Sequence, residues 1–344
     1  MDRFLSFTDE LGEHINRQAE YLYGKLKNID VYSLKMPYHC QEYFIGSHSS
    51  RLFFSIQTSA HIIYRSIKLL NKKPGDIVFL DYGAGVGTLF LLAKLTGCKK
   101  VIYSDHLDDW RKSAEIIANA TGIEINSYLV NDYRECLEEL KRQEIHCDII
   151  ASRNVVEHIY NLSDFFKAVH DYQPAALIFS STTANIKNPG SVLRHRMIHK
   201  RWEKEYLPLR RKIIAEIAPN LNESEYNILA EKTRGLAMQD LKAAVENFIK
   251  DKSIPDPSKF RTNTCQPENG LWAENLLSFE EYIKYINPAI YKISFQPGFW
   301  DTHYSKTWKN IVGKTFNTIK NLGRTAAFAV APFIYIIAEP LNKK

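Results

Sequence analysis

The sequence lacks the features that mark several classes of protein. Its 344 residues include five cysteines with no CxxC pair, which argues against a disulfide framework or a thiolate zinc site. With only 15 glycines and 13 prolines, the composition excludes collagen and a largely disordered chain. The longest apolar run, residues 325–338, falls short of the roughly 20 residues of a spanning helix, and the first residues lack the apolar stretch of a secretory signal. We therefore expect a globular protein of the reducing cytoplasm.

Short apolar runs alternate with amphipathic segments from residue 76 onward. Runs that are apolar along their whole length, each followed by a helical pattern, are typical of strands buried on both faces of a parallel sheet with right-handed crossovers. The predicted strands are residues 77–82, 100–105, 125–130, 148–152 and 176–181, and the predicted helices lie near 88–97, 108–120, 133–143 and 161–171.

This alternation stops for almost ninety residues after residue 188 and then resumes. Two charged helices are predicted over 191–216 and 223–249, followed by a polar loop at 254–270. A helix near 278–287, a strand near 291–296, a basic helical segment over 306–328 and an edge strand at 333–340 complete the pattern.

The fold class that follows is α/β: a Rossmann-like, doubly wound, mostly parallel seven-stranded sheet. Residues 1–75 read as an N-terminal helical cap, and residues 188–275 as a helical insertion after the fifth strand that serves as a substrate lid. The core would comprise residues 76–187, completed by residues 276–344.

A glycine-rich turn follows the first predicted strand. Gly83, Gly85 and Gly87 alternate with small residues and lead directly into an apolar helix. Such a turn lets the backbone approach a ligand at the carboxyl ends of the strands. A dinucleotide fingerprint would need a further glycine where Thr88 stands. Asp81, two residues before the turn, would repel a pyrophosphate but suits a ligand with an ammonium or sulfonium charge.

Asp105, which ends the second predicted strand, and Asp132, which follows the third, extend this pattern. The pattern resembles the class I S-adenosylmethionine-dependent methyltransferases over residues 76–181. The resemblance implies S-adenosyl-L-methionine as the cofactor. It also implies that Asp81 reaches the methionine end, that the three glycines line it, that Asp105 holds the ribose hydroxyls, that His106 lies near the adenine and that Asp132 accepts from the adenine amine.

After the fourth strand, the stretch from Asn154 to His158 is similar to the Val/Leu-Glu-His stretch of small-molecule methyltransferases, including the ubiquinone-pathway O-methyltransferases. In some relatives an acid three residues before the Glu-His pair helps to bind a divalent metal. Asn154 stands there, so we predict no metal and count Asn154 with the cofactor-binding residues. His158 is either a general base or, with Glu157, an element that orients the loop.

Three polar residues in the insertion, His195, His199 and Glu203, recur every four residues. The spacing could present a metal site, but no fourth ligand is evident. We favour a polar helix face with a His–Glu pair four residues apart. One of the two histidines could instead face the substrate as a base, so both are candidate catalytic residues.

Two segments carry most of the positive charge. Residues 191–212 contain eight Lys or Arg against two Glu, and residues 305–344 contain seven against one, in a chain of net charge +6. The first could receive an anionic substrate or form a solvated, salt-bridged face. The second lies beside the apolar run and could rest on an anionic membrane, although a buried strand under a helix is the simpler reading.

We therefore expect methyl transfer by in-line displacement to a small organic molecule or glycan, with O-methylation as the first choice. The first alternative is a nucleic-acid (RNA) methyltransferase that uses the basic helix, although the Asn/Asp-Pro-Pro-Tyr/Phe signature of amino-methylating nucleic-acid enzymes is absent after the fourth strand. A nicotinamide-dependent oxidoreductase and a non-catalytic scaffold are less favoured alternatives.

Overall fold

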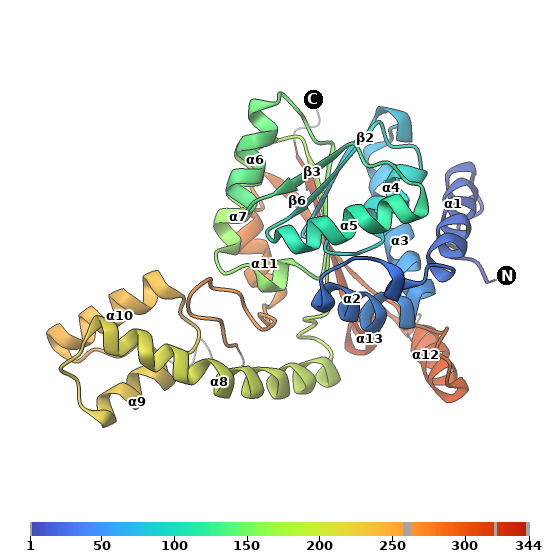
Figure 1. The fold of residues 1–344 in the computed structure, drawn as a ribbon. Helices are drawn as coiled ribbons and strands as arrows, with labels where there is room; N and C mark the ends of the chain where they lie inside the picture. The colour runs from blue at the N-terminus through green and yellow to red at the C-terminus, as the bar shows by residue number, and fades with distance from the viewer. Residues whose placement is uncertain (1, 257–262, 320–321, 342–344) are drawn as a thin grey trace.

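A computed structural model describes residues 2–256, 263–319 and 322–341 (Figure 1). Its centre is one seven-stranded sheet in the order β3-β2-β1-β4-β5-β7-β6, in which β7 runs antiparallel to its two neighbours. The predicted Rossmann-like α/β class and the strand number are therefore confirmed, and the sheet is mixed. The strands are β1 (Val78–Tyr82), β2 (Lys100–Asp105), β3 (Ser127–Val130), β4 (Ile149–Arg153), β5 (Leu177–Thr182), β6 (Tyr291–Pro297) and β7 (Ile334–Pro340).

Helices cover both faces of the sheet because successive strand residues point to opposite sides. Phe79 of β1 packs with the helices of one face, and its neighbour Leu80 packs with those of the other. The first face carries α1 (Glu10–Lys27), α3 (Leu52–Leu70), α4 (Leu89–Leu95) and α5 (Asp108–Thr121); the second carries α6 (Tyr133–Arg142), α7 (Leu162–Tyr172) and α11 (Phe279–Ile286).

The N-terminal segment, residues 2–75, contributes side chains to the main core and also reaches the carboxyl ends of the strands. Ile56, Ala60 and Ile63 of α3 are fully buried in the same hydrophobic cluster as Phe79. The short helix α2 (Tyr38–Tyr43), the π-helix Phe44–His48 and the 3₁₀ helix Ser49–Arg51 then bring polar residues of this segment to the carboxyl end of β1.

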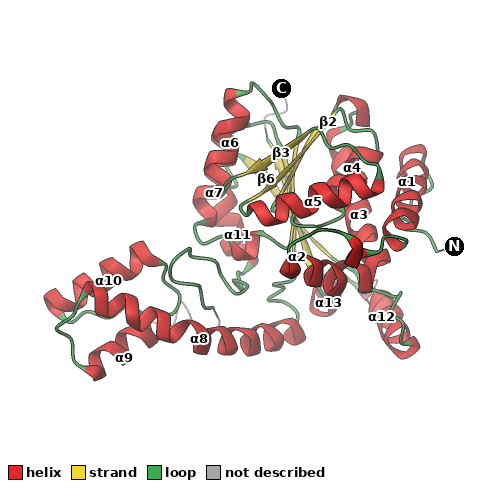
Figure 2. Cartoon of the chain, in the orientation of Figure 1, coloured by secondary structure: helices red, strands yellow, loops and turns green. Residues whose placement is uncertain are grey.

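The insertion forms a helical unit that projects away from the sheet (Figures 1 and 2). It consists of α8 (Pro189–Ile217), α9 (Glu223–Lys232) and α10 (Met238–Asp251), which share a small hydrophobic core of their own. The prediction of one helix over 223–249 is wrong, because the chain turns at 233–237, around Gly235. Part of the predicted loop at 254–270, residues 257–262, lies outside the described residues.

The predicted basic segment is helical and forms two helices, α12 (Thr307–Ile319) and α13 (Arg324–Val330), and Gly323 between them has a φ of 136°. One prediction about the C-terminal region is wrong. The last strand, β7, is not at an edge. It lies between β5 and β6 and is buried along almost its whole length, which explains its continuous apolar sequence. Lys320, Lys343 and Lys344 of the predicted basic segment lie outside the described residues.

Candidate functional site

The glycine turn lies where the strand order reverses, between β2 and β4 on either side of β1. Open α/β sheets bind ligands in the crevice at this point. Gly83 and Gly85 adopt φ values of 67° and 51°, which favour glycine. A Cβ on Gly83 would lie 2.6 Å from Val155 Cγ2, whereas a Cβ on Gly85 would meet nothing within 4 Å. Gly83 therefore allows the turn to pack, and Gly85 leaves space for a ligand.

Asp81 lies beneath this turn and is 2% exposed. Its Oδ2 accepts a hydrogen bond of 2.9 Å from the backbone N of Phe90, in the first turn of α4. Burial raises the pKa of this carboxyl to about 7, while the nearby Arg153 guanidinium acts to lower it. Asp81 lines a cavity together with Gly83, Gly85 and Gly87, so all four predicted residues meet.

Asp105 braces the glycine turn from β2. Its Oδ2 accepts from Gly85 N at 2.9 Å, and its Oδ1 accepts from Leu107 N at 3.2 Å. His106 beside it is exposed, with Nδ1 3.2 Å from Asp105 Oδ1. Asp132 is also exposed and caps α6, accepting from the backbone N of Arg134 and of Glu135. Asp105 ends β2, His106 follows it directly, and Asp132 follows β3, so all three lie at the carboxyl ends of these strands.

Arg153, at the end of β4, is the main functional residue that the sequence did not reveal. Its Nη1 donates to Ser55 O at 2.8 Å and lies within 3.4 Å of the hydroxyls of Thr58, Ser59 and Thr88. All these partners are neutral, and among the described residues no carboxylate forms an ion pair with it. A guanidinium held in this way, largely out of water, is poised to receive an anion.

His48 belongs to the same cluster and is 4% exposed. Its Nδ1 lies 3.3 Å from Arg153 Nη2 and 2.9 Å from Ser55 Oγ. Because a guanidinium only donates, Nδ1 must be the acceptor, and the proton of the neutral ring sits on Nε2. Burial and the charge of Arg153 lower the pKa of His48 to about 3. His48 therefore offers a hydrogen-bond donor to the cavity and not a base.

Two small cavities meet at Arg153 and Asn154. One, of about 90 Å³, contains the glycine turn, Asp81 and His48. The other, of about 120 Å³, is lined by hydroxyls of the N-terminal segment and of β5 and its end, together with Phe54 and Phe333. Asn154 is exposed with a φ of 58°, so its backbone bends between the two cavities. Arg153 and Asn154 thus line both cavities.

The Glu-His pair after β4 contacts the insertion. His158 Nδ1 is 2.9 Å from Trp272 O, and the backbone N of Asn275 donates to Glu157 O at 2.8 Å. Since a carbonyl only accepts, His158 Nδ1 is the donor in this contact. In the described part of the chain, His158 lines neither of the two cavities. Glu157 is fully buried, and burial raises the pKa of its carboxyl.

The two insertion histidines are buried and engaged with a loop residue, Glu274. His195 Nε2 contacts the Glu274 carboxylate, and His199 Nε2 donates to Glu274 O at 2.7 Å. The predicted pair with Glu203 does not form, because Glu203 binds Arg234 at 3.2 Å. The prediction failed because the competing partners come from distant parts of the chain. Among the described residues, no group of three side chains could hold a metal ion.

The basic segment at 191–212 is partly structural. Arg210 is 1% exposed and donates only to backbone carbonyls and to Cys265 Sγ. Arg194 pairs with Glu274 and Arg211 with Glu223. Lys212 lies 3.9 Å from Glu216, and the exposed charges that remain are those of Arg196, Lys200, Arg201 and Lys204.

The buried histidines predict a pH dependence of stability. Burial lowers the pKa of His199 to about 4, from an ordinary value of 6.5. The unfolded chain therefore binds protons that the folded chain does not, and stability falls as the pH drops from 6.5 toward 4. We expect His199→Gln to reduce this acid slope by about 1 kcal/mol per pH unit in urea unfolding. An unchanged slope would contradict a buried, neutral His199.

No protein-family model matches this chain, and no curated protein matches it. Among solved structures, it is similar to an S-adenosylmethionine-dependent methyltransferase from Mesorhizobium loti, with 12% identity and a TM-score of 0.41 over 81% of this chain and 97% of that one. It is also similar to TrmN from Thermus thermophilus (21% identity, TM-score 0.30, 37% of this chain and 38% of that one). A third similar structure is SMU.776, described as a methyltransferase and crystallised with SAH. It has 14% identity and a TM-score of 0.31, over 39% of this chain and 37% of that one.

The chain thus spans less than two fifths of the length of the last two structures. At such identities no residue role is carried over, and the assignment of the site depends on the geometry of this chain. No helix in the described ranges is long and apolar enough to cross a bilayer.

Proposed function

We propose that this protein transfers a methyl group from S-adenosyl-L-methionine to a small organic molecule or glycan, most readily to an oxygen. The observation that carries the proposal is a pair of opposite charges in one cavity at the glycine turn. Asp81 and Arg153 both line it. Asn154 lies at its border with the second, hydroxyl-lined cavity, which we take as the acceptor side. The amino-acid end of this cofactor carries an ammonium and a carboxylate, so a carboxylate and a guanidinium match it.

The other residues of the turn fit the same ligand. Gly85 faces open space, and the Asp105 carboxylate has lone pairs left after accepting from Gly85 and Leu107, so it can also accept from ribose hydroxyls. His106 and Asp132 are exposed beyond it, where an adenine would extend. When bound, the cofactor supplies an electrophilic methyl group on a sulfonium.

The acceptor side suits a polar substrate. Ser47, Ser181 and Thr183 line its cavity with hydroxyls, and Arg51 and Arg153 add positive charge, which favours an anionic acceptor. His158 remains our candidate base, because Nδ1 donates to Trp272 O and Nε2 is the ring nitrogen left to accept a substrate proton. His195 and His199 are assigned instead to positioning the loop at Glu274. We also propose a reducing, cytoplasmic setting, which the five free cysteines support.

Cofactor binding to a matched pair of glycine variants tests the proposal. Gly85 and Gly122 both have a positive φ, and a Cβ at either would meet no atom within 4 Å. Each Ala substitution should cost about 1 kcal/mol of stability from the backbone alone. Only Gly85→Ala should weaken S-adenosylmethionine binding, by roughly tenfold or more, because its Cβ enters the ligand space. Calorimetric titration and unfolding midpoints measure both effects.

The wild-type titration also separates the alternatives. Heat of binding with NAD but not with S-adenosylmethionine would replace the proposal by a nicotinamide-dependent enzyme. Binding of neither would favour a scaffold without catalytic activity. Equal affinities of the two glycine variants would show that the turn does not contact the cofactor.

A further inference from the structure

The helix α12 shows an apolar face to solvent. Trp308, Ile311 and Val312 are 62%, 60% and 39% exposed, and their spacing places them on one side of the helix. The opposite side is fixed to the protein: Gly313 packs against the backbone of Asp301, and Asn317 exchanges hydrogen bonds with the backbone of Trp300. The apolar side chains are therefore held outward by a helix that is itself anchored.

Positive charge surrounds this apolar face. Lys306, Lys309 and Lys314 belong to or immediately precede α12, and none has an ion-pair partner among the described residues. The sequence contains no Asp or Glu between Asp301 and Glu339. A helix with exposed Trp and aliphatic residues flanked by lysines has the composition of one that lies in the interface of a membrane.

We propose that α12 docks on the surface of an anionic lipid bilayer. Trp308, Ile311 and Val312 would enter the headgroup boundary, and the lysines would contact anionic lipid, each contributing about 1 kcal/mol. A second copy of the chain fits less well, because a two-fold contact through this face would bring the lysines of both copies together. Nucleic acid would pair with the lysines but leave the apolar side chains uncovered.

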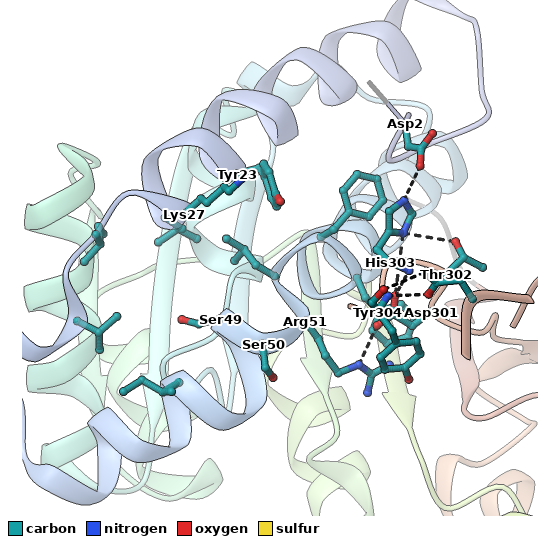
Figure 3. A pocket seen from close by; sticks show the side chains of 18 of the residues that line it. Asp2, Tyr23, Lys27, Ser49, Ser50, Arg51, Asp301, Thr302, His303 and Tyr304 are labelled. Atoms are coloured by element: carbon teal, nitrogen blue, oxygen red, sulfur yellow. Dashed lines mark hydrogen bonds and ion pairs between the residues drawn. The ribbon is translucent and has the colours of Figure 1, made fainter. Parts of the chain in front are cut away.

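The position of α12 beside a further cavity determines which part of the protein this docking would bring to the membrane. That cavity, of about 890 Å³, lies between α12 and the N-terminal segment, and Ile311 and Lys314 form part of its lining. Figure 3 shows Arg51, Asp301 and His303 gathered on one side of it and Tyr23 and Lys27 on the other.

Arg51, which binds Asp301 at 2.9 Å, lines both this groove and the cavity on the acceptor side. Docking would bring the groove to the lipid surface, where Arg51 would receive the headgroup of an anionic amphiphile beside the cavity that contains Arg153. This last step rests on the proposed function, whereas the docking itself does not.

Vesicle flotation tests the docking. The full-length chain should float with vesicles of phosphatidylcholine containing about a third phosphatidylglycerol, and stay unbound with pure phosphatidylcholine. Trp308→Ser/Ile311→Ser and Lys306→Glu/Lys309→Glu/Lys314→Glu should each reduce the bound fraction at least tenfold. The α12 side chains concerned lie at the surface, so S-adenosylmethionine titration should be unchanged in both variants.

The insertion supplies matched controls. Leu193 and Met197 on α8 are 62% and 67% exposed, and Lys200, Arg201 and Lys204 are exposed nearby. Leu193→Ser/Met197→Ser and Lys200→Glu/Arg201→Glu/Lys204→Glu should bind vesicles as the wild type does. The proposal is overturned if anionic vesicles leave the wild type unbound or if the α8 variants lose as much binding as the α12 variants. A dimer in light scattering that Trp308→Ser/Ile311→Ser abolishes would assign the face to a second copy.

Discussion

Replacing Arg153 with methionine is expected to weaken S-adenosylmethionine binding by roughly 30-fold or more. The guanidinium lies at the cofactor cavity with only neutral hydrogen-bond partners, so an incoming carboxylate would provide its first ion pair. Removing one partner of a buried charged pair costs about 2–5 kcal/mol. Methionine keeps much of the volume but cannot donate a hydrogen bond to the incoming carboxylate.

As a control, the carboxylate can be removed from the cofactor instead of the guanidinium from the protein. Decarboxylated S-adenosylmethionine retains the sulfonium, ribose and adenine but has no group for Arg153 to bind. If Arg153 holds that carboxylate, wild type and Arg153→Met should bind the decarboxylated compound with similar affinity. An equal loss with both compounds would show that Arg153 acts by holding Ser55 and Thr88 in place, and not by contacting the cofactor.

Local patterns in the sequence were enough to predict the strands, the glycine turn and the acids at the ends of the strands. These features depend on spacing and side-chain type over a few residues, and Asp81, Gly83, Gly85 and Gly87 accordingly meet in one cavity. The place of β7 in the sheet was not predictable in this way. An apolar strand fits an edge covered by a helix or a central position equally well until its partners are known.

The polar cluster at Arg153 shows more clearly what local sequence patterns cannot predict. Its partners His48 and Ser55 come from a segment about a hundred residues earlier, and no local motif links them. The same holds for His195 and His199, whose partner Glu274 lies nearly eighty residues later in the chain. Spacing alone paired them with Glu203 on their own helix, but contacts between distant segments decided otherwise.

Replacing Arg210 with methionine is expected to destabilise the insertion by about 3–5 kcal/mol. Its guanidinium donates to Thr233 O at 2.7 Å, Leu236 O at 2.5 Å, Arg234 O at 3.1 Å and Cys265 O at 2.8 Å. These carbonyls belong to the turn between α9 and α10 and to the loop beyond α10. Methionine would leave them buried without donors, and hydrogen bonds to a charged group are each worth about 1.5–3 kcal/mol.

The neighbouring Arg211 provides the control for this loss. Its ion pair with Glu223 lies at the surface, with exposed fractions of 36% and 80%, so Arg211→Met should change stability by less than about 0.5 kcal/mol. Because the insertion has its own hydrophobic core, Arg210→Met should melt it separately, giving a first urea transition and early proteolysis within residues 189–251. S-adenosylmethionine affinity should be preserved, since Arg210 lies on the insertion and not at the glycine turn. Similar unfolding curves for the two variants would mean that Arg210 does not hold the insertion together.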